Sequence, residues 1–248
     1  MIIDNDVEII EGLPIIYIKS LSAIVCSDLH LGYEGVFADS GTFLPKRNLS
    51  HILKLLKEAK EKTNAKTLII TGDIKNDFSK VHNEELNEYL DLVTYVKTKL
   101  EIQDIQIIKG NHDNFIDSIN KSHIKIYSKE ANLGNFTFIH GSEIPSTKTF
   151  SFLIMGHVHP SLFLVSDTGK KEKLKCFLYG QNNKNQKILV IPAMSYFAEG
   201  LSVNLERVDK MAPIFQKIFN IDTLEALCIG EGETLDFGNV GELRKLMK

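Results

Sequence analysis

Residues 23–113 alternate between short apolar runs and longer amphipathic segments, and this order limits the possible fold more than any other feature. The apolar runs are "AIVCSD" (23–28), "TLIITGD" (67–73) and "IQIIKGNHD" (105–113). Between them lie "LSHILKLLKEAKEK" (49–62) and "NEELNEYLDLVTYVKTKL" (83–100), in which apolar residues recur at helical spacing. The order strand, helix, strand, helix, strand predicts a βαβαβ unit with parallel strands.

Closely spaced strands dominate the second half of the chain. The runs "NFTFIHG", "SFLIMGHVHP", "SLFLVSD", "KLKCFLYG" and "KILVIPAMS" are separated by turn residues, with no long helix between them. This pattern predicts an antiparallel or mixed sheet. The charge-rich "DTGKKEKLK" (167–175) is expected to form a solvated hairpin loop.

No repeat, linker or low-complexity tract separates the two halves, so we expect a single domain over 1–248 built from two sheets. Its motif core spans 23–195. The remaining segment, 196–248, contains the strand-like "TLEALCIG" and ends in the helical "VGELRKLMK". We expect this extension to complete a sheet, with a homodimer contact as the alternative.

Composition and charge describe an ordinary globular protein. The chain has 248 residues, 43% of them hydrophobic, and a formal net charge of −3, which argues against holding long nucleic acid by charge alone. The N-terminus "MIIDNDVEII" carries acids where a secretory signal carries Lys or Arg, and its apolar stretches are too short to span a membrane. Cys26, Cys176 and Cys228 are widely spaced, which indicates reduced core thiols. We therefore expect a cytoplasmic protein with no membrane partner.

Polar side chains follow five of the apolar runs. They are Asp28 and His30, Asp73, Asn111 and His112, His140, and His157 with His159. In open α/β sheets, ligands bind at the carboxyl ends of strands. The sequence therefore predicts that these side chains meet at one edge and form a site.

The residue types indicate a metal site. Setting His112 aside, seven oxygen or nitrogen donors without a thiolate suit Mn²⁺, with Fe, Zn²⁺ or Ni²⁺ as alternatives. Asp28/His30 and His157/His159 are each two positions apart, and on an extended backbone such side chains share a face. So many donors exceed the needs of one ion that also keeps water. Two divalent ions about 3.5–4 Å apart are the expected solution.

The order "DLH", "GD", "GNHD", a lone His140 and "GHVH" resembles the calcineurin-like metallophosphoesterase superfamily from Asp28 to His159. Each motif alone is weak, but all five in this order are specific. The resemblance implies a two-sheet α/β/β/α sandwich. "DLHLGYE" followed by "LPKRN" is most similar to the small SbcD-related archaeal phosphoesterases.

The resemblance also implies a role for each side chain. Three residues would hold one metal and three the other: Asp28, His30 and His159; and Asn111, His140 and His157. Asp73 would bridge the two ions, and a hydroxide between them would attack phosphorus. His112 would protonate the leaving group or stabilise its developing charge.

Asn76 departs from the family pattern, in which many members carry an acidic residue or a histidine at this position. Its amide can hydrogen-bond to His112, but it cannot stabilise an imidazolium as a carboxylate does. Further candidate substrate contacts are Tyr33, beside Glu34, and Arg47, beside Lys46; a solvated helix start is the alternative for the last two. Three other histidines follow no strand and are assigned to surface or packing: His51, His82 and His123.

Three functions fit these residues. The favoured one is phosphodiester hydrolysis, with DNA, RNA or a small nucleotide diester as the substrate. It is favoured over monoester hydrolysis because the motifs carry only Lys75 and Lys109 as nearby cations. Monoester hydrolysis is the second function, and a metal-binding interaction scaffold with little turnover is the third. The scaffold hypothesis is weakened because every ligand position and the position of His112 carry the expected residue.

Overall fold

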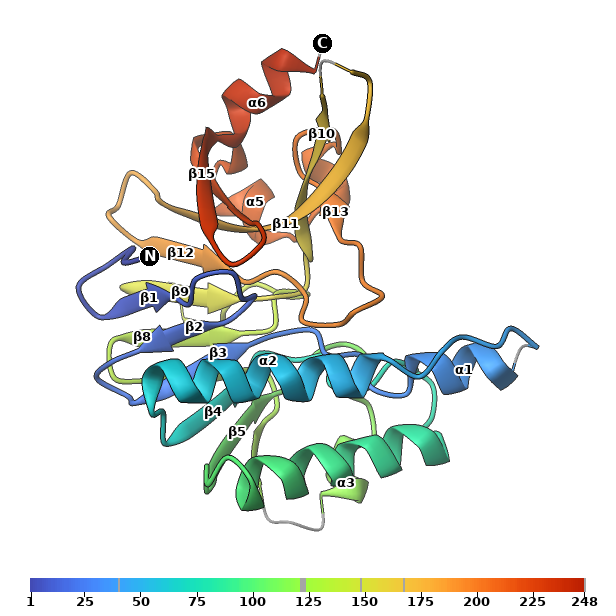
Figure 1. Ribbon diagram of the computed structural model, residues 1–248. Helices are drawn as coiled ribbons and strands as arrows, with labels where there is room; N and C mark the ends of the chain where they lie inside the picture. The colour runs from blue at the N-terminus through green and yellow to red at the C-terminus, as the bar shows by residue number, and fades with distance from the viewer. Residues whose placement is uncertain (40, 121–123, 148, 167, 248) are drawn as a thin grey trace.

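Two β-sheets pack face to face, and helices lie on their outer sides (Figure 1). The computed structural model describes residues 1–39, 41–120, 124–147, 149–166 and 168–247. Within these ranges no helix is long and apolar enough to cross a membrane.

The first sheet has six strands in the order β1-β2-β3-β4-β5-β6. They are β1 (Val7–Ile9), β2 (Ile16–Ile18), β3 (Ala23–Cys26), β4 (Thr67–Ile70), β5 (Asp104–Ile108) and β6 (Lys125–Tyr127). Strands β3 to β6 are parallel, whereas β1 and β2 are antiparallel additions at one edge. The predicted parallel βαβαβ unit is therefore confirmed.

The second sheet is mixed, as predicted, and follows the path β13-β10-β11-β12-β9-β8-β7. Its strands are β7 (Glu130–Leu133), β8 (Phe136–Ile139), β9 (Phe152–Met155), β10 (Pro160–Val165), β11 (Lys171–Gln181), β12 (Lys187–Val190) and β13 (Leu201–Ser202). Two C-terminal strands, β14 (Glu225–Ile229) and β15 (Thr234–Asn239), extend it, because β14 pairs with β11 and with β15.

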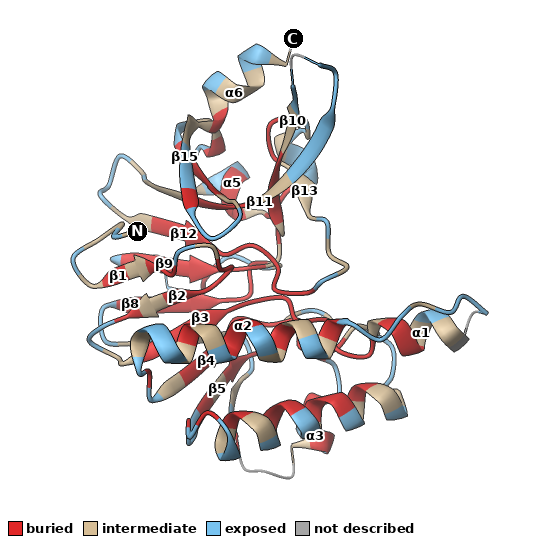
Figure 2. Cartoon of the chain, viewed as in Figure 1, coloured by how far each residue is buried: buried red, intermediate tan, exposed pale blue. Residues whose placement is uncertain are grey.

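The helices form the outer layers. They are α1 (Tyr33–Asp39), α2 (Asn48–Thr63), α3 (Asn83–Thr98), α4 (Ile116–Ile119), α5 (Ile214–Lys217) and α6 (Val240–Leu246). Apolar residues of α2 and α3 pack on the first sheet, while α5 and α6 pack on the second sheet. A third apolar cluster fills the space between the sheets. This gives the expected α/β/β/α order. Strands β3, β8 and β9 are buried throughout, and β4 and β12 are buried except at their first residue (Figure 2).

The prediction of a solvated loop at 167–175 is wrong for 171–175. This stretch begins β11 and pairs antiparallel with β10, in a register that places Val165 opposite Lys171 and Ser161 opposite Lys175. Leu174 packs into the core on one face of the strand, which explains why a lysine-rich stretch forms a strand. Residue 167 lies outside the described residues.

The three cysteines are free and buried, as predicted. Cys26 lies at the end of β3, and Cys176 lies opposite Cys228 in the β11–β14 pair. Burial raises the pKa of the Cys26 and Cys176 thiols, so both side chains are neutral packing groups.

Candidate metal centre

The predicted donors lie on turns that follow the strands, not on the strands themselves. Five of them have a positive φ angle: Asp28 (57°), His30 (47°), Asp73 (49°), His157 (67°) and His159 (46°). The expectation that the Asp-x-His and His-x-His pairs share one face of an extended strand is therefore wrong. Left-handed backbone costs about 1–2 kcal/mol per non-glycine residue and concentrates at functional sites. The rest of the fold compensates this strain to aim the donors inward.

Close contact between the turns requires glycine at two positions. A Cβ atom on Gly110 would lie 2.1 Å from Asp73 Oδ1, and one on Gly156 would lie 1.7 Å from Ser27 Oγ. Any larger residue would separate the turns and move the donors apart. The glycines of "KGNHD" and "MGHVH" are thus needed for the site to close.

Two groups of donors converge and share one carboxylate. The first group is Asp28, His30, Asp73 and His159; the second is Asp73, His140 and His157. Within each group the donor atoms all lie within 4.8 Å of one another. Asp73 belongs to both groups.

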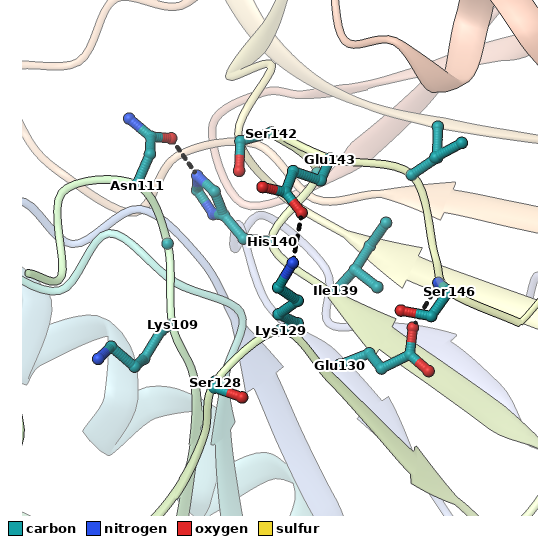
Figure 3. Close-up of a pocket in the computed structure, with 13 residues that line it drawn as sticks. Lys109, Asn111, Ser128, Lys129, Glu130, Ile139, His140, Ser142, Glu143 and Ser146 are labelled. Atoms are coloured by element: carbon teal, nitrogen blue, oxygen red, sulfur yellow. Dashed lines mark hydrogen bonds and ion pairs between the residues drawn. The ribbon is translucent and has the colours of Figure 1, made fainter.

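Asn111 joins the second group through its side-chain oxygen. Its Oδ1 lies 3.1 Å from His140 Nε2 (Figure 3). All seven predicted donors are therefore brought together at one edge of the fold.

The surroundings of His140 fit a cation. Its Nδ1 donates to the Thr71 carbonyl at 2.9 Å, which leaves Nε2 as the atom that faces the centre. Nε2 lies 3.3 Å from Asp73 Oδ2, 3.1 Å from Asn111 Oδ1 and 3.1 Å from His157 Nδ1. A carboxylate oxygen can only accept, so a proton or a metal ion must lie between these groups.

The surroundings of His30 fit a cation as well. Its buried Nδ1 has no hydrogen-bond partner among the described residues, and its Nε2 faces His159 Nε2 at 3.3 Å. His159 Nε2 in turn lies 3.2 Å from Asp28 Oδ1. Buried imidazole nitrogens and carboxylate oxygens without thiolates are the donor set of hard or borderline divalent ions. The residues present therefore fit divalent metal binding.

Electrostatics favour the same conclusion. Burial lowers the pKa of both His30 and His157 to about 4, so both imidazoles are neutral near pH 7 and can act as ligands. Burial also lowers the pKa of His140, but its hydrogen bond to Asp73 and the charges of Asp28 and Asp73 raise it to about 9. The two buried carboxylates thus draw positive charge into the centre.

His112 is placed at the edge of the centre. Its backbone N–H donates to Asp73 Oδ1 at 2.9 Å, and its side chain remains 28% exposed. Its Nδ1 donates to the backbone carbonyl of Asn76, because a carbonyl can only accept. The other ring nitrogen, Nε2, lies 3.9 Å from Asp73 Oδ2. The expected contact between Asn76 and His112 therefore exists, but through the backbone of Asn76 and not its amide side chain.

Asp113 is one positioning residue that the sequence analysis left without a role. This fully buried carboxylate accepts from the Ile74 N–H at 2.8 Å and from the Gly110 N–H at 2.8 Å. It therefore fixes the turn that bears Asp73 against the turn that bears His112. The signal was present in "GNHD", in which an acid follows the histidine.

Asn48 is a second residue of this kind. Its Nδ2 donates to the carbonyls of Leu29 and His30 at 2.9 Å each, and its Oδ1 accepts from the Tyr196 N–H at 2.8 Å. It joins the turn after β3, which carries Asp28 and His30, to the loop after β12. No sequence pattern pointed to it, because its partners lie far away along the chain.

A small cavity of about 170 Å³ borders the centre on the side of Asn111 and His140 (Figure 3). We call it the narrow side. Its walls include Lys109 and Lys129, and both are already paired: Lys109 with Asp117 at 2.7 Å and Lys129 with Glu143 at 3.2 Å.

A larger cavity of about 650 Å³ borders the centre on the other side, against His30, His157 and His159. We call it the wide side. Tyr33 and Asn76 line it, so two of the three candidate substrate contacts lie beside the metal centre.

The remaining candidates lie elsewhere. Arg47 lines a separate cavity together with Lys46, and its guanidinium faces the Tyr196 hydroxyl at 3.5 Å. Glu34 accepts from the Arg47 and Asn48 N–H groups at the start of α2. His51 contacts Tyr196, and His82 pairs with Asp77, while His123 lies outside the described residues.

The sequence model of the calcineurin-like phosphoesterases matches residues 21–190, which is more than half of the chain. The chain belongs to this family. It is therefore a phosphoester hydrolase, and its Asp and His cluster fits the divalent metal binding of such enzymes. A search of curated proteins finds no match.

One solved structure shares the fold of this phosphoesterase, and a second aligns less closely. The nuclease MPE of Pseudomonas putida aligns at a TM-score of 0.59 with 17% identity, over 92% of this chain and 93% of that chain. Yfce, a phosphoesterase from E. coli, aligns at a TM-score of 0.44 with 14% identity, over 86% of this chain and 96% of that chain. The first likeness confirms the two-sheet α/β fold. The finer likeness to SbcD-related enzymes stays a prediction.

Proposed function

We propose that this phosphoesterase hydrolyses phosphodiesters with two divalent ions that share Asp73. The observation that carries this proposal is the presence of Asp73 in both donor groups. Among the seven donors only Asp28 and Asp73 are carboxylates, and only a carboxylate offers one oxygen to each of two ions. The remaining donors divide between them: Asp28, His30 and His159 for one ion, and Asn111, His140 and His157 for the other.

When bound, the ions supply Lewis-acid stabilisation of the phosphoryl oxygens and lower the pKa of the attacking water. Mn²⁺ is our first choice, because the donors are oxygen and imidazole nitrogen without sulfur. Fe, Zn²⁺ and Ni²⁺ suit the same set. Three buried free thiols accord with a reducing compartment, and we place the enzyme in the cytoplasm.

His112 is the proposed general acid. The Asn76 carbonyl holds the Nδ1 proton, so Nε2 is the atom that turns toward the substrate. The Asp73 carboxylate fixes the backbone of His112 through its N–H. This placement lets His112 give a proton to a leaving oxygen without holding a metal.

The charges near the centre favour a diester over a monoester. The lysines of the motifs are engaged elsewhere: Lys75 Nζ donates to the Lys80 carbonyl at 2.9 Å, and Lys109 pairs with Asp117. No arginine lines the narrow or the wide side among the described residues. A dianionic monoester would therefore find no free cation in the motifs themselves beyond the metals, whereas a diester carries a single charge. A nuclease acting on DNA or RNA is the biological form we favour.

Hydrolysis of bis-p-nitrophenyl phosphate and p-nitrophenyl phosphate, measured side by side with Mn²⁺, Ni²⁺ and Mg²⁺, tests this function. We expect a higher kcat/KM for the diester with at least one of these metals. A monoester preference under every metal would overturn the assignment.

Asp73→Asn tests the shared carboxylate. We expect this variant to bind less Mn²⁺ per chain and to lose hydrolysis, while its circular dichroism spectrum stays unchanged. Asp117→Asn is the matched control, because this exposed carboxylate contacts Lys109 and no metal donor. Full activity of Asp73→Asn would contradict the two-ion proposal.

A further inference from the structure

The β10–β11 hairpin carries a row of lysines on one face. In a strand, side chains two apart share a face about 7 Å apart, so Lys171, Lys173 and Lys175 lie on the same face of β11. Leu174, on the opposite face, packs into the core of the second sheet. The lysine face is therefore the face turned away from that core. The outer end of the hairpin is exposed (Figure 2).

The inner end of this row lies beside the metal centre. Lys175 Nζ donates to the carbonyls of Ala193 at 2.8 Å and Ser195 at 2.5 Å. The Ser195 N–H in turn donates to the Asp28 carbonyl at 3.1 Å. Lys175 thus fixes the row to the loop that borders the first group of metal donors.

The outer two lysines have no counter-charge. Lys173 lines the wide side together with His30 and His159, and Lys171 follows one step further out. Neither ammonium group forms a hydrogen bond or an ion pair with the residues that the structure describes. Lys170, by contrast, pairs with Glu172. Among the described residues that line the wide side, the one acid is Glu199, which is exposed.

Part of the lining of the wide side is aromatic. Tyr33 stacks between Phe37, with ring centroids 4.7 Å apart, and Phe197, with centroids 4.9 Å apart and planes 10° apart. Tyr33 and Phe197 both line the cavity, and Phe197 ends this stack. Aromatic walls beside cationic side chains are the means by which proteins bind single-stranded nucleic acid, since each base offers a π-face and each phosphate a charge.

We propose that the wide side and the lysine face of β11 bind a single-stranded nucleic acid and lead one of its phosphodiesters to the metal centre. A base packs against Phe197, the ring at the end of this stack, and the adjoining phosphates lie along Lys173 and Lys171. This inference rests on the proposed function. A duplex fits less well, because its paired bases cannot reach an aromatic wall.

The volume and the charge agree with this occupant. A cavity of about 650 Å³ is of the size that takes ligands of one or two nucleotides. The formal net charge of the chain is −3, so a strong field over the whole surface is absent and binding must depend on local cations. Two unpaired lysines at phosphate-like spacing meet that requirement.

Equilibrium binding of a fluorescein-labelled oligothymidylate with cleavage-resistant phosphorothioate linkages tests the lysine row. The Mn²⁺-loaded protein is titrated at several salt concentrations. For single strands, each phosphate contact contributes about 0.7 to the slope of log K against log[salt]. The double variant Lys171→Gln/Lys173→Gln should lower the slope by about 1.4.

Lys170→Gln is the control. It removes one positive charge, against two in the double variant, from a neighbouring lysine that Glu172 already neutralises. Its slope should equal that of the wild type. Equal losses in the control and in the double variant would show that only general charge matters and would overturn the proposal. Tighter binding of a duplex of equal length would also overturn it.

Phe197→Leu tests the aromatic wall separately. Stacking of one base is worth about 1–3 kcal/mol, so this variant should bind the oligonucleotide about tenfold more weakly with an unchanged salt slope. Hydrolysis of bis-p-nitrophenyl phosphate by the wild type separates the two proposals. The wild type could hydrolyse this diester while the lysine and Phe197 variants bind the oligonucleotide normally. In that case the proposed binding of nucleic acid along the wide side and β11 is wrong, and the proposed function stands. If the wild type hydrolyses no diester, the proposed function fails.

Discussion

The two sides of the metal centre differ in how far their charged groups are already satisfied. On the narrow side, Lys129 pairs with Glu143, and Glu130 accepts from the Ser146 N–H at 2.7 Å, around about 170 Å³ of space (Figure 3). On the wide side, Lys173 is unpaired and about 650 Å³ is available. A binding surface keeps unsatisfied groups for its ligand, whereas a self-paired wall has little to offer one. The contrast therefore predicts that the substrate extends toward the wide side.

Among the residues outside the seven metal donors, the largest effect should come from His112, which lies beside Asp73 at the edge of the centre. A general acid contributes about 10²–10⁴-fold to rate, so His112→Gln should lower kcat by that factor while both ions remain bound. The loss should be smaller for bis-p-nitrophenyl phosphate than for an oligonucleotide, because p-nitrophenolate leaves without needing a proton. Steady-state kinetics and metal analysis of the purified variant test this.

Loss of one ion from His112→Gln would show instead that His112 is a ligand. The turn that carries it also carries Asn111, so metal analysis must accompany the kinetics. His51→Gln is the control, because His51 contacts Tyr196 and lies outside both donor groups.

The chemistry of the centre could be predicted from the sequence, because each donor immediately follows an apolar run that forms a strand. Asp73 after β4 and His140 after β8 are examples. Parallel strands end at one edge, so local pattern and global position agree there. The order of the motifs then indicated the family, which the match over residues 21–190 confirms.

The backbone conformation that brings the metal donors together could not be predicted from the sequence in the same way. Left-handed φ angles at Asp28 and His159 depend on contacts between turns more than a hundred residues apart, such as the His157 N–H with Asp28. The lysine-rich start of β11 was misjudged for a related reason. Its charge suggested a loop, whereas its pairing with β10 and the packing of Leu174 outweigh that preference.

A smaller effect on activity should come from Asn48, which holds the loop that borders the wide side. Asn48 is fully buried, and truncation would leave two carbonyls and the Tyr196 N–H without their partner. Asn48→Ala should lower the free energy of unfolding by about 3 kcal/mol, measured by denaturant titration. It should also raise KM for the oligonucleotide, because the loop after β12 borders the wide side.

Asn87→Ala provides the comparison for Asn48→Ala. Asn87 is exposed on α3, where alanine favours the helix, so its free energy of unfolding should change by less than about 0.5 kcal/mol. Equal destabilisation by the two substitutions would mean that Asn48 does not join the two loops in the way its hydrogen bonds indicate.

The smallest effect is expected on the narrow side. Lys129 and Glu143 are 68% and 71% exposed, and an exposed ion pair contributes about 0–1 kcal/mol. Lys129→Gln should therefore leave stability, kcat/KM and the salt slope of oligonucleotide binding nearly unchanged.

Glu143→Gln is the more informative variant, because it frees Lys129 and gives the narrow side an unpaired lysine like that of the wide side. If unpaired charge is what distinguishes the two sides, the slope of log K against log[salt] for oligonucleotide binding should increase by up to about 0.7 in this variant. A large loss of oligonucleotide affinity in Lys129→Gln would show that the nucleic acid lies on the narrow side, and the comparison would then be reversed.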